Sequence, residues 1–170
     1  MAVRPDPEVG YRRAGDHLRG DGVERRVFVQ APPRAVWAAL HDPGAWSQLF
    51  PELRLGPAAP SWPAAAATRT AKTRLGLLRE VARVESLEAR PESTFRLRVT
   101  GSGFQSEWWW RLEPIAGGTR VIHAATFEPI DRWTDILVRL GRRSLEARVE
   151  AHLRALKDRA ERTERTSPAA

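Results

Sequence analysis

The sequence predicts an α+β domain in which a curved antiparallel sheet of about seven strands wraps around one long C-terminal helix. Apolar and polar residues alternate through most of residues 67–128, with turn residues at intervals of about ten. From residue 131 onward, apolar residues recur at the short spacing typical of an amphipathic helix. Packing the apolar stripe of that helix against the apolar face of the sheet buries both surfaces.

The chain has 170 residues, which fits one domain of ordinary size. Residues 1–22 are rich in proline, glycine and alternating charges, so we expect an N-terminal arm, free to be disordered. Residues 163–170 are polar or small, and we expect a C-terminal tail there. The domain itself is therefore predicted to span residues 23–162.

The first elements are a strand and two short helices. Alternation predicts a strand over residues 23–31. Pro33 suits the first turn of the following helix, because a proline lacks the N–H that this position does not need. Residues 42–44, Asp-Pro-Gly, end that helix, and a second short helix is predicted over residues 45–50 before Pro51 stops it.

Four prolines follow within residues 51–66, too many for a central strand. We therefore predict an edge strand near residues 52–55 and then a long loop that carries Trp62. Loops of this length in a compact domain often have a function. The segment 57–66 is either a solvated loop or a gate over a pocket.

The rest of the sheet is predicted as a meander of antiparallel strands joined by short turns. The strands are predicted at residues 69–77, 79–88, 94–100, 104–113 and 121–129. A hairpin through residues 117–118 places Trp110 opposite His123 and Trp108 opposite Ala125. The long helix then begins near Asp131, which can cap it, and Gly141 marks a point where it can bend or pack closely.

Composition excludes several classes of site. The chain has no cysteine, which rules out disulfides, thiolate zinc sites and cysteine nucleophiles. The formal net charge is +7, but no segment concentrates it: the most basic one, residues 52–75, has four bases and one acid. A nucleic-acid partner is therefore not expected. No apolar run approaches the ~20 residues of a membrane span and no signal peptide is visible, so we expect a cytoplasmic protein.

Four segments together resemble the START-like, or SRPBCC, superfamily, which includes the polyketide cyclase/dehydrase and lipid-transport proteins and the Bet v 1-like fold. Residues 27–43, VFVQAPPRAVWAALHDP, resemble its opening, and residues 46–51 its short second helix. Residues 110–121 resemble its late hairpin and residues 153–157 the end of its long helix. The resemblance covers about residues 23–162. It implies a helix-grip fold with a cavity between sheet and helix, a hydrophobic ligand and no standard cofactor.

A binding or carrier function for a hydrophobic small molecule, such as a lipid, polyketide, quinone or aromatic compound, is the preferred interpretation. Large aromatic residues dominate cores generally, so the run Trp108-Trp109-Trp110 also has a simple packing explanation. In this fold the inner sheet face is both core and pocket wall. The residues predicted at the pocket are Trp46, Phe50, Trp62, Leu75, Val84, Phe95, Leu97, Trp108, Trp110, His123, Ala125, Trp133, Ile136, Leu137 and Leu140.

Two other functions stay open at this point. A cyclase, aromatase or dehydratase would use His123 as its acid or base, although a histidine among aromatic residues is more often a hydrogen-bonded core residue. An interaction module would use a basic outer sheet face formed by Lys72, Arg74, Arg96 and Arg98. No metal site is expected, since the four histidines lie far apart in the sequence. Trp109, on the outer face, is a candidate contact in a homodimer or at a membrane surface, and the choice between monomer and homodimer stays open.

Overall fold

The computed structural model describes residues 22–42, 44–57, 62–75, 78–130 and 132–166. It contains a seven-stranded antiparallel sheet, two short helices after the first strand, and one long C-terminal helix. The predicted fold class is therefore confirmed. The predicted arm, residues 1–22, lies outside the described residues except for its last position, and so does the proposed cap Asp131.

The two short helices lie side by side between the first two strands of the sequence. Strand β1 (Val23–Val29) ends before Pro32, and α1 (Pro33–His41) begins at the proline that suits a first turn. Helix α2 (Trp46–Leu49) is a single turn. The turn between them is held by Asp42, whose Oδ1 accepts a hydrogen bond from the Gly44 N–H at 2.8 Å and whose other oxygen pairs with Arg159 of the last helix.

The remaining strands follow one another as a meander. They are β2 (Leu53–Leu55), β3 (Thr68–Leu75), β4 (Leu78–Arg90), β5 (Thr94–Thr100), β6 (Phe104–Ile115) and β7 (Gly118–Pro129). Across the sheet the order is β1-β7-β6-β5-β4-β3-β2, so β1 and the short β2 form its two edges. Residues 58–61 of the predicted loop lie outside the described part of the chain.

The pairing of β6 with β7 fixes which residues face inward. Trp110 lies opposite His123 and Trp108 opposite Ala125, so the predicted register is confirmed. Along β6 every second residue from Phe104 to Leu112 is buried, as alternation requires when one face of a sheet covers a core.

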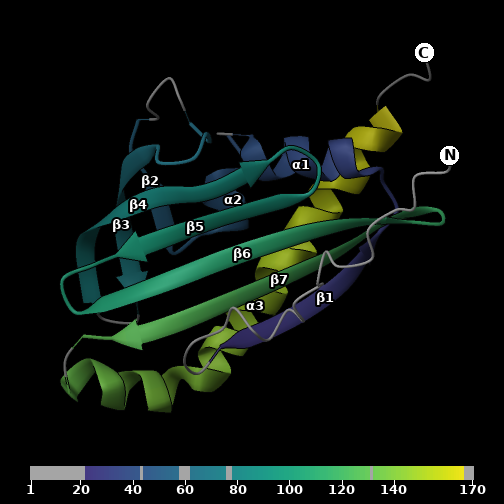
Figure 1. Cartoon of the computed structure of the whole chain (residues 1–170). Helices are drawn as coiled ribbons and strands as arrows, with labels where there is room; N and C mark the ends of the chain where they lie inside the picture. The colour runs from purple at the N-terminus through teal and green to yellow at the C-terminus, as the bar shows by residue number, and fades with distance from the viewer. Residues whose placement is uncertain (1–21, 43, 58–61, 76–77, 131, 167–170) are drawn as a thin grey trace, which may run out of the picture.

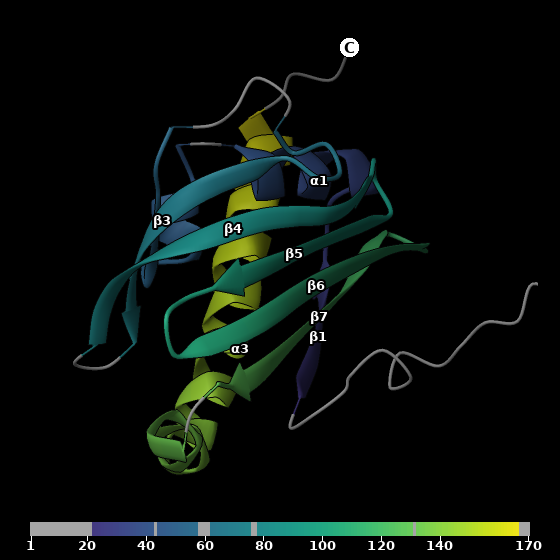
Figure 2. The same cartoon turned by 60° about the vertical axis from the view of Figure 1, so that its left-hand side comes forward.

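Helix α3 (Arg132–Thr166) lies across the concave face of the sheet, and the strands curve around it (Figures 1 and 2). Its inward side buries Val149, Leu153, Leu156 and Ala160. The figures show a bend in the first half of the helix, the half that contains Gly141. The helix continues beyond residue 162 into the range predicted as a tail.

The outer face of the sheet is charged, and some of its basic residues form ion pairs within the chain. Glu107 on β6 binds Arg96 and Arg98 of β5, with one N–O distance of 2.6 Å to each. Two of the four basic residues proposed as an interaction surface are therefore paired within the chain. Lys72 is exposed, and the Arg74 side chain lies outside the described part. Trp109, beside these pairs, is half-buried.

Candidate functional site

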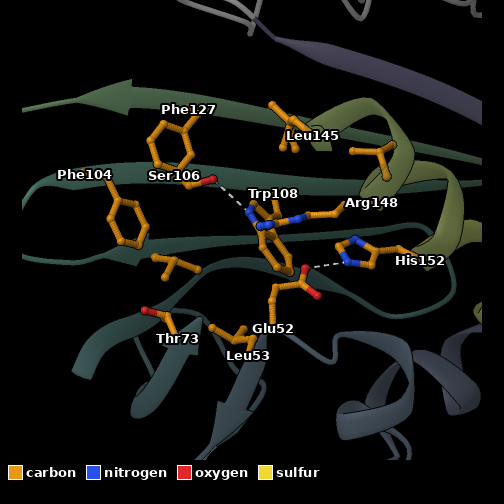
Figure 3. A pocket seen from close by; sticks show the side chains of 13 residues that line it. Glu52, Leu53, Thr73, Phe104, Ser106, Trp108, Phe127, Leu145, Arg148 and His152 are labelled. Carbon is orange, nitrogen blue, oxygen red and sulfur yellow. Dashed lines mark hydrogen bonds and ion pairs between the residues drawn. The ribbon is translucent and has the colours of Figure 1, made fainter. Parts of the chain in front are cut away.

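A cavity of about 40 Å³ lies between the β2–β3 edge of the sheet and the middle of α3 (Figure 3). Its walls come from the loop before β2, from the inward faces of β2, β3, β5, β6 and β7, and from one face of α3. The lining residues are Glu52, Leu53, Thr73, Val99, Phe104, Ser106, Trp108, Ala125, Phe127, Leu145, Arg148, Val149 and His152. Most of this wall is apolar, and its polar groups are few and distinct.

Two of the residues predicted for the pocket, Trp108 and Ala125, line this cavity. Others that were predicted there form the solid core beside it: Trp46, Phe50, Val84, Phe95, Leu97, Trp110 and His123 are all buried but do not line it. Trp62 is half-buried, and its ring lies edge-on to Trp46 at 6.1 Å between centroids. The side chains of Leu75, Trp133, Ile136, Leu137 and Leu140 lie outside the described part of the structure.

The aromatic core explains why the cavity is small. Phe50 packs against Trp108 and Trp110, with ring centroids 5.4 and 5.5 Å apart. Phe95 stacks on the far side of Trp110, at 5.6 Å. These large rings pack together beside the cavity, since aromatic side chains contribute most of the volume of such a core.

Trp108 is held at the cavity wall by hydrogen bonds as well as by packing. Its Nε1–H donates to Ser106 Oγ at 2.8 Å, and the Ser106 hydroxyl donates to the backbone carbonyl of Thr126 at 2.7 Å. The indole N–H is thus satisfied inside the protein. The ring therefore presents a fixed apolar surface to the cavity (Figure 3).

A chain of hydrogen bonds joins the cavity wall to the core. Glu52 Oε1 lies 2.6 Å from His152 Nε2, and His152 Nδ1 lies 3.3 Å from His123 Nε2. His123 Nδ1 in turn lies 3.1 Å from the backbone carbonyl oxygen of Trp109. His123 is fully buried, with its ring stacked on Trp110 at 4.4 Å, whereas His152 and Glu52 line the cavity.

The protons of this chain can be counted. A backbone carbonyl only accepts hydrogen bonds, so the bond to Trp109 requires a proton on His123 Nδ1. His123 Nε2 is then an acceptor if that ring is neutral, and His152 Nδ1 must donate to it. The third proton lies between His152 Nε2 and Glu52. A fully bonded chain therefore leaves Glu52 and His152 with no net charge together, as a carboxylate beside an imidazolium or as two neutral groups.

The environment decides which groups are charged. Burial lowers the pKa of His123 to about 3, helped by the nearby charge of His152, so this imidazole stays neutral. Burial alone would raise the pKa of Glu52, but the hydrogen bond and the charge of His152 outweigh it and the pKa is lowered. The Glu52 carboxylate is therefore ionised at neutral pH.

Arg148 adds the only other ionisable side chain among the described residues that line the cavity. It is half-buried and lies one helical turn before His152 on the same face of α3. Figure 3 shows its side chain reaching over Trp108. Its charge lowers the pKa of Glu52, although no ion pair joins the two residues.

Several residues that line the cavity could have been predicted from the alternating pattern of the strands. Phe104 and Ser106 share the alternating face of Trp108, and Phe127 shares that of Ala125. Glu52 could not be predicted in this way, because it follows a proline in an irregular stretch and its partner His152 lies 100 positions away. His152 lies between Val149 and Leu156 in the apolar stripe of the last helix, and nothing in the sequence indicates its partners.

Two kinds of feature are absent from the described part of the chain. No group of three or more histidine, aspartate or glutamate side chains there is arranged to hold a metal ion. Among the described helices, none combines the length and the apolar character required to cross a membrane.

Comparison with known proteins places the chain among solved structures of one fold. It superposes on a protein of Thermus thermophilus with a TM-score of 0.68 and 21% identity, covering 86% of this chain and 100% of the other. It also superposes on the Zhui aromatase/cyclase of a Streptomyces species, with a TM-score of 0.70 and 16% identity, covering 88% and 99% of the two chains.

A search of curated protein sequences gave no match. A family profile, in contrast, matches residues 22–161, which is most of the chain. The strand order, the long helix across the sheet and this match agree with the resemblance seen in the sequence. The chain therefore belongs to the family described as polyketide cyclase/dehydrase and lipid transport.

Proposed function

We propose that this protein binds a hydrophobic small molecule in the cavity between the β2–β3 edge of the sheet and α3. The observation that carries the proposal is the wall itself, which is mostly apolar and has three ionisable groups on one side. Ligand sites typically combine such a wall with a few polar groups that orient the ligand. Family membership supports this function, and so does the fold shared with an aromatase/cyclase.

A ligand of ordinary size needs more room than the cavity has. A volume of about 40 Å³ holds about three water molecules, whereas pockets for small ligands typically reach ~300 Å³ or more. Binding must therefore separate elements that now touch. We expect the separation to be that of β2 from α3, because β2 is a three-residue strand at the edge of the sheet and pairs on one side only.

Binding can be tested with phenylnaphthylamine, an uncharged aromatic probe that fluoresces in apolar surroundings. The variant Ala125→Leu adds volume at the cavity wall and is expected to abolish binding. Ala124→Leu makes the same change one position away, on the opposite face of β7, and is expected to bind the probe normally. Equal binding by wild type and Ala125→Leu would place the probe elsewhere and contradict the proposal.

Native mass spectrometry of protein purified from its own host tests the same proposal without a chosen probe. A retained small molecule would identify the ligand class, whether lipid, polyketide, quinone or another aromatic compound. The same preparation of Ala125→Leu is the control and should be free of that molecule.

A second candidate function is acid–base catalysis of the cyclase or dehydratase type. Both nitrogens of His152 are occupied by hydrogen bonds, so the group with an atom left for a substrate is the Glu52 carboxylate. Its free oxygen can accept a proton from a carbon between two carbonyls. The enolate carbon then attacks another carbonyl carbon, and the new alkoxide recovers the proton. His152 and His123 hold the carboxylate in position.

The catalytic candidate is tested by turnover of a linear poly-β-ketone thioester to an aromatic product, followed by absorbance. Glu52→Gln should lose turnover yet still bind phenylnaphthylamine. Glu113→Gln, which alters a surface carboxylate that pairs with Arg111 and Arg120, is the control. Full turnover in Glu52→Gln would exclude this role, and full turnover in His123→Ala would exclude any need for His123.

A further inference from the structure

We propose that the molecule bound in this cavity carries an anionic oxygen group, and that Arg148 binds that group. This inference depends on the proposed function and gives it a ligand class: an apolar body with a carboxylate or similar acid group at one end. It follows from the position of Arg148, from the lack of a hydrogen-bond or ion-pair partner for it among the described residues, and from the charge of the cavity wall.

The position of Arg148 directs its side chain to the cavity. Along α3, Leu145, Arg148, Val149 and His152 are spaced three or four residues apart, so they share one face of the helix, and all four line the cavity. Figure 3 shows the guanidinium group in front of Trp108 rather than turned out from the helix. A ligand lying against Trp108 would therefore meet this group.

Arg148 has no hydrogen-bond or ion-pair partner among the described residues, although its charge acts on Glu52. No hydrogen bond or ion pair of its guanidinium is found in this part of the chain, although the side chain is half-buried. Other half-buried arginines, in contrast, are paired: Arg25 binds Glu146 and Glu150, and Arg159 binds Asp42. A guanidinium has five N–H donors, and partial burial without acceptors is unfavourable unless something else supplies them.

The net charge of the cavity wall indicates that the ligand group bound by Arg148 is negatively charged. Glu52, His152 and Arg148 are the ionisable groups among the described lining residues. In the fully bonded chain Glu52 and His152 together are neutral, because one proton is shared over their 2.6 Å contact. The net charge of the wall is therefore that of Arg148, and an anion is the group that neutralises it. Glu52 interacts with Arg148 through its charge, but its hydrogen bond goes to His152, so the donors of the guanidinium have no acceptor in Glu52.

The geometry of the guanidinium further indicates which kind of anionic group the ligand carries. Its planar fork of donors matches two oxygens of one acid group, which a single hydroxyl or ketone cannot offer. The remaining wall, which includes Leu53, Val99, Phe104 and Phe127, provides no charge for a second polar end. In a molecule with one acid group and one apolar body, the acid group would bind Arg148 and the apolar body would pack against the rest of the wall.

The experiment compares two fluorescent probes with the same aromatic skeleton. Anilinonaphthalene sulfonate carries one anionic oxygen group, and phenylnaphthylamine lacks it. In Arg148→Gln, the dissociation constant of the sulfonate should rise about tenfold, because a charge-assisted contact is lost. That of phenylnaphthylamine should change by less than about twofold. Arg154→Gln removes the same charge from an exposed position of α3 and is the control, with both constants unchanged.

The outcomes separate this inference from the proposed function. If phenylnaphthylamine binds the wild type and Ala125→Leu abolishes that binding, the cavity binds apolar molecules, and this conclusion does not depend on Arg148. If Arg148→Gln then weakens both probes equally, or neither, the assignment to Arg148 is wrong. If neither probe binds the wild type, the proposed function fails and this inference fails with it. Arg148→Lys keeps the charge without the planar fork and should bind the sulfonate with intermediate affinity.

Discussion

A neutral imidazole in the core makes the stability of this protein depend on pH. His123 stays uncharged in the native state down to pH about 3, whereas the unfolded chain protonates it below pH 6.5. Between these values the unfolded state binds more protons, so stability falls as pH is lowered. His41 adds to this fall, because burial lowers its pKa as well.

For wild type we expect the free energy of unfolding to fall by about 1.5–2 kcal/mol from this histidine between pH 7 and pH 5. His123→Gln should be less stable at pH 7 but should lose less on acidification, because the titrating group is gone. Urea unfolding at the two pH values measures both effects. An unchanged pH dependence in the variant would show that His123 is charged in the native protein.

For single residues, the sequence predicted the position of side chains in regularly alternating strands correctly, but it did not predict the position of side chains outside such a pattern. Trp108 and Ala125 were placed at the cavity because strand alternation put them on the inner face. Glu52 and Arg148 were missed, since one lies in an irregular loop and the other is a charged residue beside an apolar stripe. Which face of a helix meets a cavity depends on tertiary packing that no local pattern contains.

Among the elements, the turn between β6 and β7 is where β1 approaches most closely. A Cβ built on Gly118 would lie 2.2 Å from the backbone oxygen of Val29 and 3.0 Å from the Phe28 ring. Only a glycine fits there, because the nearest atom belongs to the backbone and cannot rotate away. The close approach allows β1 to pair with β7 along its whole length.

We therefore expect Gly118→Ala to lower the free energy of unfolding by about 1–3 kcal/mol, since β1 must shift to admit the methyl group. Gly44→Ala is the milder control: its Cβ would lie 3.3 Å from the carboxylate oxygen of Asp42, which must shift by only a few tenths of an ångström. That variant should change stability by less than about 0.5 kcal/mol. Chemical denaturation compares the two, and equal losses would contradict the steric explanation.

Elements with a strong local pattern were predicted within a few residues of their ends. The strand predicted at residues 94–100 has those limits, and the Pro-Gly break between α1 and α2 was correctly located. Strand β4 was predicted too short and runs to Arg90, with an irregularity between Ser86 and Glu88 that interrupts the alternation. Such bulges shift the pattern by one residue, so sequence alternation ends before the strand does.

For the whole molecule, a ligand that binds the native state alone must stabilise it. At a free concentration about 100 times its dissociation constant, phenylnaphthylamine should add about 2.7 kcal/mol to the free energy of unfolding. For a domain of this size the melting temperature should rise by roughly 5–10 °C. Differential scanning calorimetry measures the shift, and Ala125→Leu should show none. A similar shift in that variant would indicate binding outside the cavity.

The hydrogen-bond chain from Trp109 to Glu52 also limits how the sequence can change. Glu52 and His152 lie 100 positions apart and His123 is 29 from His152, yet replacing any one of them alone leaves at least one buried hydrogen-bonding atom of a neighbour unpaired. Glu52→Leu should cost about 2 kcal/mol, because it leaves His152 Nε2 buried without its hydrogen-bond partner, and Glu52→Leu with His152→Leu and His123→Leu should cost less. Unfolding measurements on the single and triple variants test this, and strictly additive losses would contradict it. If the triple variant recovers stability, two stable sequences are separated by less stable intermediates, and these three distant positions are inherited as one unit.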